Sequence, residues 1–290
     1  MKRLIPLLLL LAWLLAGCSG TEPPAQVAAT TLPVYEFTLR ITVGTGISVA
    51  RLVTEQVSCL HDYSLNVKQV KAVEAADVVV LSGAGLEDFM DDLLAGAPVI
   101  DASAGISLLC GQEEHEDHDL EGHHHEEDPH IWLSPENAKA MARNICAGLC
   151  ARYPEHRDTF SENLSGLLED LDQLEAYGKE RLAGLTCREL IPFHDGFSYF
   201  AREFDLDILK AVEEESGQEA SARELIELIG LVEEHRLSAI FTEKSGSASA
   251  ASIIARETGC SVFELDMAMA GDSYFEAMYH NIDVIKEALG

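Results

Sequence analysis

The segment EEHEDHDLEGHHHEED, residues 113–128, could bind metal ions. It holds five of the chain's eleven histidines among nine acidic residues, and Leu120 is its one large apolar side chain. Such a composition cannot pack into a core, so the segment is expected to form a loop in solvent. Neutral imidazole and carboxylate both bind divalent cations, and zinc is the commonest of these at histidine-rich sites. The competing interpretation is an acidic loop without a metal role. The candidate zinc-capturing side chains of the loop are His115, His118, His123, His124 and His125.

Three other histidines lie where a folded metal site could form. His61 is in a loop after a predicted strand at 47–53, and His194 directly follows a predicted strand at 189–193. His130 comes at the exit of the acidic loop, just before a predicted helix. Open α/β sheets bind ligands beyond the carboxyl ends of their strands. We therefore predict that these three imidazoles bind one metal ion. The remaining histidines, expected in solvent on helix surfaces, are His156, His235 and His280.

A tetrahedral zinc site with three imidazoles leaves one position for another ligand. An oxygen ligand would neutralise part of the charge of the ion, and two carboxylates stand at the ends of predicted strands. Glu243 follows the strand at 239–242, and Asp266 follows the strand at 261–265. The spacing of the residues does not choose between these two carboxylates.

Apolar periodicity predicts an α/β architecture in each half of the chain. Continuous apolar runs such as Val78–Leu81 are typical of buried parallel strands. Between the halves, Ser134 and Pro135 favour a helix start, because serine caps a helix and proline suits its first turn. We therefore predict two lobes, each a parallel-sheet α/β sandwich, joined by a long rigid helix. The predicted strands are 27–30, 47–53, 77–81, 98–100, 189–193, 239–242 and 261–265, and the predicted helices are 33–41, 67–73, 86–94, 135–152, 155–183, 197–204, 221–232, 247–257 and 274–289.

The N-terminal residues are typical of an export signal. Lys2 and Arg3 precede an apolar run at 4–16, which is too short to span a bilayer comfortably. The run ends in Leu-Ala-Gly-Cys, which resembles the lipobox of bacterial lipoproteins and makes Cys18 the expected lipidation site. An ordinary signal peptide is the alternative. The predicted organisation is a signal peptide at 1–17, a lipidated tether at 18–26, an N-terminal lobe at 27–134, a helical connector at 135–183 and a C-terminal lobe at 184–290.

The charge of the chain excludes some partners. Its formal net charge at pH 7 is −30, which repels nucleic acid and attracts cations. Cys146 and Cys150 are one helical turn apart and are expected to be buried helix positions, while the disulfide state cannot be deduced from sequence. The sequence has no CxxC pair, so a thiolate zinc cluster is not expected.

The whole mature chain resembles a known family. It is similar to the zinc and manganese solute-binding lipoproteins of bacterial ABC uptake systems, in the cluster with a long helix between the lobes. Together the matching motifs, in the right order, are specific. They are TTLPVYEF at 30–37, HDY at 61–63, AADVVVLSGAGLE at 75–87, DPHIW at 128–132, FHDGFSYF at 193–200, IFTE at 240–243 and the stretch from Val262 to Asp266 with the terminal helix.

The resemblance implies a metal site in the cleft between the lobes. Its ligands would be His61, His130, His194 and Asp266, with Glu243 as a secondary candidate. A histidine at position 194 favours zinc, since the manganese binders of the family tend to have glutamate there. The resemblance also implies that Zn(II) is a transported ligand and that the protein is not an enzyme. The implied partners are an ABC permease membrane subunit with its ATPase, for a monomer that is lipid-anchored outside the cytoplasm on a bacterial cell membrane.

Three alternatives remain at this point. The first is a manganese or iron receptor of the same family, and the second is a surface zinc-scavenging adhesin or buffer without transport. The third, a zinc hydrolase, is disfavoured because no HExxH motif occurs. If the cleft binds zinc, ligands from both lobes should meet when the lobes close, and deletion of 113–128 should leave the affinity of the cleft nearly unchanged.

Overall fold

The structure is a computed structural model that describes residues 24–55, 57, 60, 63–110, 127–212, 220–244 and 248–290. Several predicted site residues lie outside the described residues. These are Cys18, His61, His115, His118, His123, His124 and His125.

The N-terminal lobe is built on a four-stranded parallel sheet with the strand order β2-β1-β3-β4. The apolar run predicted to be a buried strand forms β3 at its centre, where Val80 is fully buried. The helix predicted over 86–94 is instead a 3₁₀ turn followed by one α-helical turn. Glu87 explains the difference, because its carboxylate accepts the N–H groups of Ser82 and Gly83 and so holds the start of this segment in a loop. The elements are β1 Val27–Ala29, α2 Leu32–Thr42, β2 Val49–Arg51, α3 Val67–Ala75, β3 Val78–Leu81, η1 Asp88–Met90, α4 Asp91–Leu94 and β4 Val99–Asp101.

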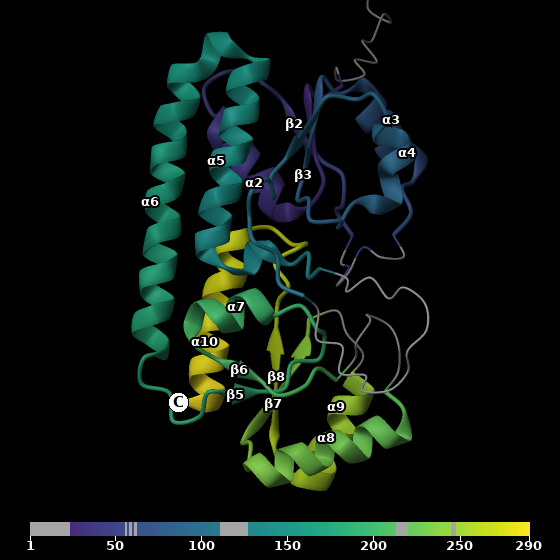
Figure 1. Cartoon of the computed structure of the whole chain (residues 1–290), viewed down its shortest axis with the longest axis vertical. Coiled ribbons are helices and arrows are strands. Elements are labelled where there is room, and N and C mark those ends of the chain that lie inside the picture. The colour runs from purple at the N-terminus through teal and green to yellow at the C-terminus, as the bar shows by residue number, and fades with distance from the viewer. Residues whose placement is uncertain are drawn as a thin grey trace, which may run out of the picture.

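Two antiparallel helices connect the lobes (Figure 1). The side-chain oxygen of Ser134 accepts the N–H of Asn137 at 3.2 Å, which caps α5. Lys139 of α5 forms ion pairs with Asp172 and Glu175 of α6 and so ties the two helices together. The helices predicted over 135–152 and 155–183 are therefore present. Their bounds are α5 Pro135–Arg152, η3 Pro154–His156 and α6 Arg157–Leu182.

The C-terminal lobe also carries parallel strands. β5 pairs with β6, β7 pairs with β8, and a parallel bridge between Pro192 and Phe241 links the two pairs. β6 was not predicted, because two residues are too few to show a periodic pattern. The elements are β5 Glu189–Leu190, α7 Ser198–Phe204, β6 Asp207–Ile208, α8 Ala222–His235, β7 Ala239–Glu243, α9 Ala248–Thr258, β8 Ser261–Leu265 and α10 Tyr274–Leu289.

One apolar core runs through both lobes, which Figure 1 shows stacked along the long axis. The chain after β8 crosses to the N-terminal lobe, where the Met267 carbonyl accepts the indole N–H of Trp132 at 2.7 Å. The Tyr274 hydroxyl donates to the Trp132 carbonyl at 2.8 Å, and the Met269 carbonyl accepts the N–H of Leu32. The predicted fold class, two parallel-sheet α/β lobes with a long helix, is confirmed. These hydrogen bonds also join the two lobes.

The cysteine and membrane predictions have structural outcomes as well. Cys146 and Cys150 are buried on α5 as predicted, with their sulfurs 4.0 Å apart, so they are thiols rather than a bridge. Across the described part of the chain, every helix is too short or too polar to traverse a bilayer.

Candidate metal centre

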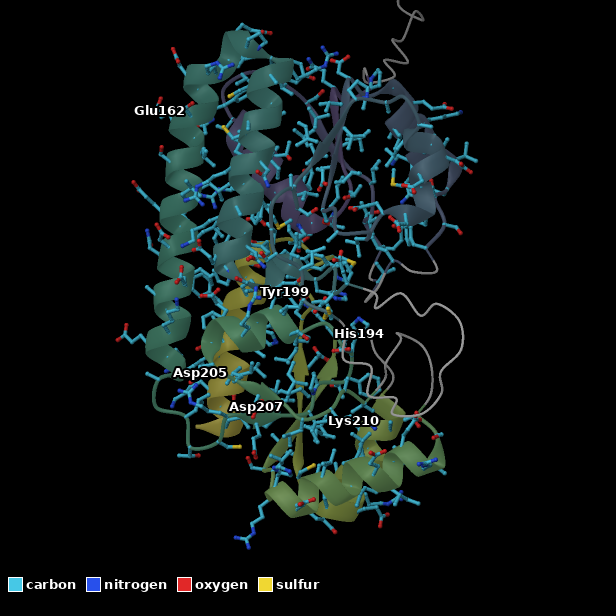
Figure 2. All side chains as sticks on the ribbon, viewed as in Figure 1. Glu162, His194, Tyr199, Asp205, Asp207 and Lys210 are labelled. Atoms are coloured by element: carbon cyan, nitrogen blue, oxygen red, sulfur yellow. The ribbon has the colours of Figure 1, made fainter. Side chains whose placement is uncertain are left out.

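The structure brings His130 and His194 together where the lobes meet. His130 lies at the start of η2, Ile131–Leu133, in the N-terminal lobe, and His194 lies between β5 and α7 in the C-terminal lobe (Figure 2). Their ring centroids are 5.2 Å apart with the rings at 83°. Both residues are buried, with 2% and 4% of their surfaces exposed. A pair of buried imidazoles from two lobes matches the predicted centre.

Asp128 fixes the orientation of the His130 ring. Its Oδ1 accepts the backbone N–H of His130 at 2.9 Å and lies 2.8 Å from Nδ1. A carboxylate at Nδ1 favours the tautomer with its proton on that nitrogen, which leaves the metal-binding lone pair on Nε2. This arrangement of carboxylate, histidine and metal is a recurrent one at zinc sites.

His194 has no such partner. Both of its ring nitrogens are buried without a hydrogen bond to any described residue. Burying polar nitrogens unsatisfied costs free energy, and a native structure normally provides a partner for them. A metal ion next to the imidazole pair would provide one, since it takes the lone pair of a ring nitrogen.

Gly196 allows this close approach. A methyl group at its Cα would lie 3.1 Å from Nδ1 of His130, 3.1 Å from Cδ2 of His194 and 2.6 Å from the methyl carbon of Met267. A side chain here would therefore push against both imidazoles. The sequence offered only the tripeptide His-Asp-Gly as a signal of this role.

The two candidate carboxylates lie at the same edge of the C-terminal sheet, where Glu243 of β7 is in register with Leu265 of β8. Glu243 is buried. The Asp266 carboxylate accepts the N–H of Ala268 at 2.8 Å and lies 3.4 Å from the Lys244 ammonium. The Lys244 ammonium would therefore compete with a metal ion for this carboxylate.

The base of the acidic loop is ordered and partly buried. Cys110 and Glu127 form an antiparallel bridge, and the Asp128 N–H donates to the Leu109 carbonyl at 2.8 Å. Asp128 is only 6% exposed, so the prediction that all of 113–128 lies in solvent was wrong for this residue. The prediction grouped Asp128 with its acidic neighbours in the sequence. In the structure, its hydrogen bonds with His130 hold Asp128 in the buried site. A deletion of 113–128 would remove this partner of His130.

The three other described histidines are on helix surfaces, as predicted. His235 lies 3.1 Å from a Glu189 carboxylate oxygen, and His280 lies 3.1 Å from the Glu264 carbonyl. His156 packs against Phe160. Within the described ranges no group of three or more ligand side chains is assembled for a metal, and the predicted third imidazole, His61, falls outside them.

Comparison with known proteins identifies the family. The family model described as zinc-uptake complex component A, periplasmic, matches residues 27–288. The chain belongs to this family. The zinc-binding lipoprotein AdcA of Streptococcus pneumoniae is 30% identical over 308 residues, covering 99% of this chain and 61% of AdcA. The chain thus spans about three fifths of this curated relative.

Solved structures of the zinc-uptake component A family share the fold. A crystal structure of ZnuA has a TM-score of 0.79 and 31% sequence identity, covering 92% of this chain and 100% of that chain. The Zn(II)-bound ZnuA-like domain of S. pneumoniae AdcA has a TM-score of 0.76 and 26% identity, covering 91% of this chain and 98% of that chain. The similarity extends through both lobes.

Proposed function

We propose that this protein is an extracytoplasmic receptor that captures Zn(II) between its lobes and delivers it to an ABC permease. One observation carries the proposal. His130 and His194, from different lobes, form a buried imidazole pair, and the ring nitrogens of His194 have no hydrogen-bond partner among the described residues. Zinc as cargo would take the lone pair of one of these nitrogens.

The proposed ligands are His61, His130, His194 and Asp266. Asp266 is preferred to Glu243 because the resemblance to the family places the carboxylate ligand at this position. An aspartate would also neutralise part of the charge of the dication. The Lys244 ammonium lies 3.4 Å from the Asp266 carboxylate, so zinc would displace a cation that this carboxylate already attracts.

Zinc is preferred to manganese for chemical reasons. Imidazole suits zinc, whereas manganese favours carboxylate, carbonyl and water oxygens. The relatives agree with this choice, since AdcA is named a zinc-binding lipoprotein and the structure of its ZnuA-like domain is Zn(II)-bound. With the proposed ligands the centre would not support hydrolysis, because a metal site that is closed by four protein ligands keeps no open position for an activated water.

The location and partners follow from the same proposal. Cys18 would carry the lipid that anchors the protein to the bacterial membrane, and residues 18–26 would be the tether. The partners would be a membrane permease subunit and its ATPase, and the receptor would act as a monomer. Residues 113–126 would collect zinc weakly near the cleft and raise its local supply.

The test is a competition titration of residues 19–290 with zinc and manganese against a chromogenic chelator. We expect one tight zinc site and much weaker manganese binding. Replacing His61, His130 or His194 with Ala should abolish the tight site, while His280→Ala, an exposed control, should leave it intact. Retention of tight binding in His130→Ala and His194→Ala would refute the proposed centre.

The fourth ligand is tested in the same titration. Asp266→Ala should weaken zinc binding strongly, and Glu243→Ala should weaken it less. The reverse order would assign the ligand role to Glu243. Zinc-dependent growth of a deletion strain in zinc-poor medium, complemented by each variant, would then test transport itself, and unimpaired growth without the protein would contradict a transport role.

A further inference from the structure

A single tyrosine hydroxyl holds both ends of the acidic loop. Tyr199 of α7 is fully buried, and its hydroxyl accepts the N–H of Leu109 at 2.9 Å. The same hydroxyl donates to the Asp128 carbonyl at 2.9 Å, and the Asp128 N–H donates to the Leu109 carbonyl at 2.8 Å. These three bonds form a closed ring, in which the C-terminal lobe supplies the hydroxyl and the N-terminal lobe supplies the peptide groups.

Asp128 connects this ring of three hydrogen bonds to the proposed zinc ligand His130. Tyr199 fixes the main chain of Asp128. The carboxylate of Asp128 in turn accepts hydrogen bonds from the backbone N–H and from Nδ1 of His130. All three residues are buried, so solvent offers no substitute for the bonds. A shift of Asp128 would turn the His130 ring, because the two bonds to Oδ1 fix its main chain and its imidazole together.

The segment that carries Tyr199 also carries the other imidazole. His194 lies five residues before Tyr199, and Gly196 between them packs against the rings of both histidines. Figure 2 labels Tyr199 on α7 and His194 in the region where the two lobes meet. One short segment of the C-terminal lobe therefore supplies a ligand and holds the ligand of the opposite lobe in place.

We propose that Tyr199 is a positioning residue for zinc capture, acting through Asp128 on His130. The inference rests on the proposed function of the imidazole pair. It assigns to Tyr199 a task that packing alone does not require, since the aromatic ring fills the core and only the hydroxyl reaches the loop base. The hydroxyl presets His130 in the orientation that zinc needs, and binding then pays little for ordering this ligand.

The test compares Tyr199→Phe with a matched control, Tyr153→Phe. Both changes keep a buried aromatic ring and remove a hydroxyl, but the Tyr153 hydroxyl bonds to Asp77 at 3.3 Å, at the other end of α5 from the site. Outer partners of metal-binding histidines typically contribute about 10–100-fold to metal affinity. Because Tyr199 acts one bond further out, we expect its loss to raise the zinc dissociation constant about tenfold, the lower end of that range.

A second readout separates positioning from general destabilisation. The ring ¹⁵N chemical shifts of His130 in the metal-free protein report which nitrogen carries the proton. Tyr199→Phe should broaden or move these signals, and Tyr153→Phe should leave them unchanged even where it lowers the melting temperature. Equal zinc affinity and equal ¹⁵N shifts for the two variants would overturn the proposal.

The same series distinguishes failure of this inference from failure of the proposed function. The unmodified protein and His130→Ala are titrated beside the tyrosine variants. If the unmodified protein has no tight zinc site, or His130→Ala retains it, the proposed function fails and the positioning role fails with it. If both behave as expected and Tyr199→Phe matches Tyr153→Phe, only the role of Tyr199 is wrong.

Discussion

The metal centre and the acidic loop can be separated by one designed replacement. Because Cys110 and Glu127 are neighbours across an antiparallel bridge, residues 111–126 can be exchanged for a short glycine-containing hairpin loop. The replacement keeps Asp128 and all four proposed ligands. We expect it to leave the zinc affinity of the centre unchanged.

Substitution of Asp128, unlike replacement of the loop, should weaken zinc binding. In the loop-replaced protein, Asp128→Ala removes the acceptor of two hydrogen bonds from His130, and losing such a partner costs about 10–100-fold in metal affinity, or about 1.4–2.7 kcal/mol. Asp128→Asn can keep both bonds, since both go to Oδ1, but its oxygen is neutral. Charge-assisted bonds are roughly twice as strong as neutral ones, so this variant should lose about half of that free energy, or about 3–10-fold in affinity.

The assay is the chelator competition already described, on the loop-replaced protein and its variants. Asp92→Ala is the control, since it removes one exposed acid of the same lobe and tests the effect of net charge alone. Loss of tight binding on loop replacement would place the zinc site in the loop and refute the centre at His130 and His194. Full affinity in Asp128→Ala would show that the carboxylate does not orient His130.

Three further predictions concern other residues. Gly196→Ala should weaken zinc binding by about 5–150-fold, because overpacking costs about 1–3 kcal/mol and the new methyl presses on both imidazoles; Gly166→Ala, in open space on α6, should not weaken it in the same titration. Burial raises the pKa of Glu87 to about 7, above its usual value of 4.5. The raised pKa of Glu87 therefore stabilises the fold fully below about pH 4.5, and this stabilisation of up to about 3 kcal/mol is lost as the pH rises through about 7. The free energy of unfolding measured in urea should fall with pH in this range, and Glu87→Gln should reduce that fall. Lys244→Ala should change zinc affinity by no more than about fivefold, in the direction of tighter binding, since exposed ion pairs contribute about 0–1 kcal/mol; weaker zinc binding in the titration would show that Lys244 does not compete with the metal for Asp266.

The sequence predicted most of the scaffold because local patterns determine it. The apolar run at 78–81 forms β3, and the capping pair at 134–135 starts α5 where expected. The prediction failed at two places that apolar periodicity does not describe. The capture of Glu87 by the loop before it shortened a predicted helix, and β6 is too short to leave a pattern.

The sequence likewise predicted some residues of the candidate site and missed others. His130 and His194 were predicted because histidines after strands are a local signal, and the structure brings them together. The roles of Gly196 and Tyr199 depend on contacts across long sequence separations, such as the 71 residues between Tyr199 and Asp128. A single sequence contains no pattern that pairs such positions, so only the folded chain reveals them.

The joined core of the lobes leads to a last prediction, about the motion that accompanies zinc capture. The sequence suggested that the lobes close on the metal, but wide opening would separate Trp132 from Met267 and Tyr274. Trp132 and Tyr274 are both fully buried, and exposing two such side chains costs about 3 kcal/mol or more, so a wide-open form would be a minor species. We therefore expect the change on zinc binding to be confined to the segments at 128–130 and 194–199. Small-angle scattering should give the same radius of gyration with and without zinc, while amide exchange should slow in these two segments. A clear decrease in the radius of gyration on zinc binding would show that the shared core opens and that this reasoning is wrong.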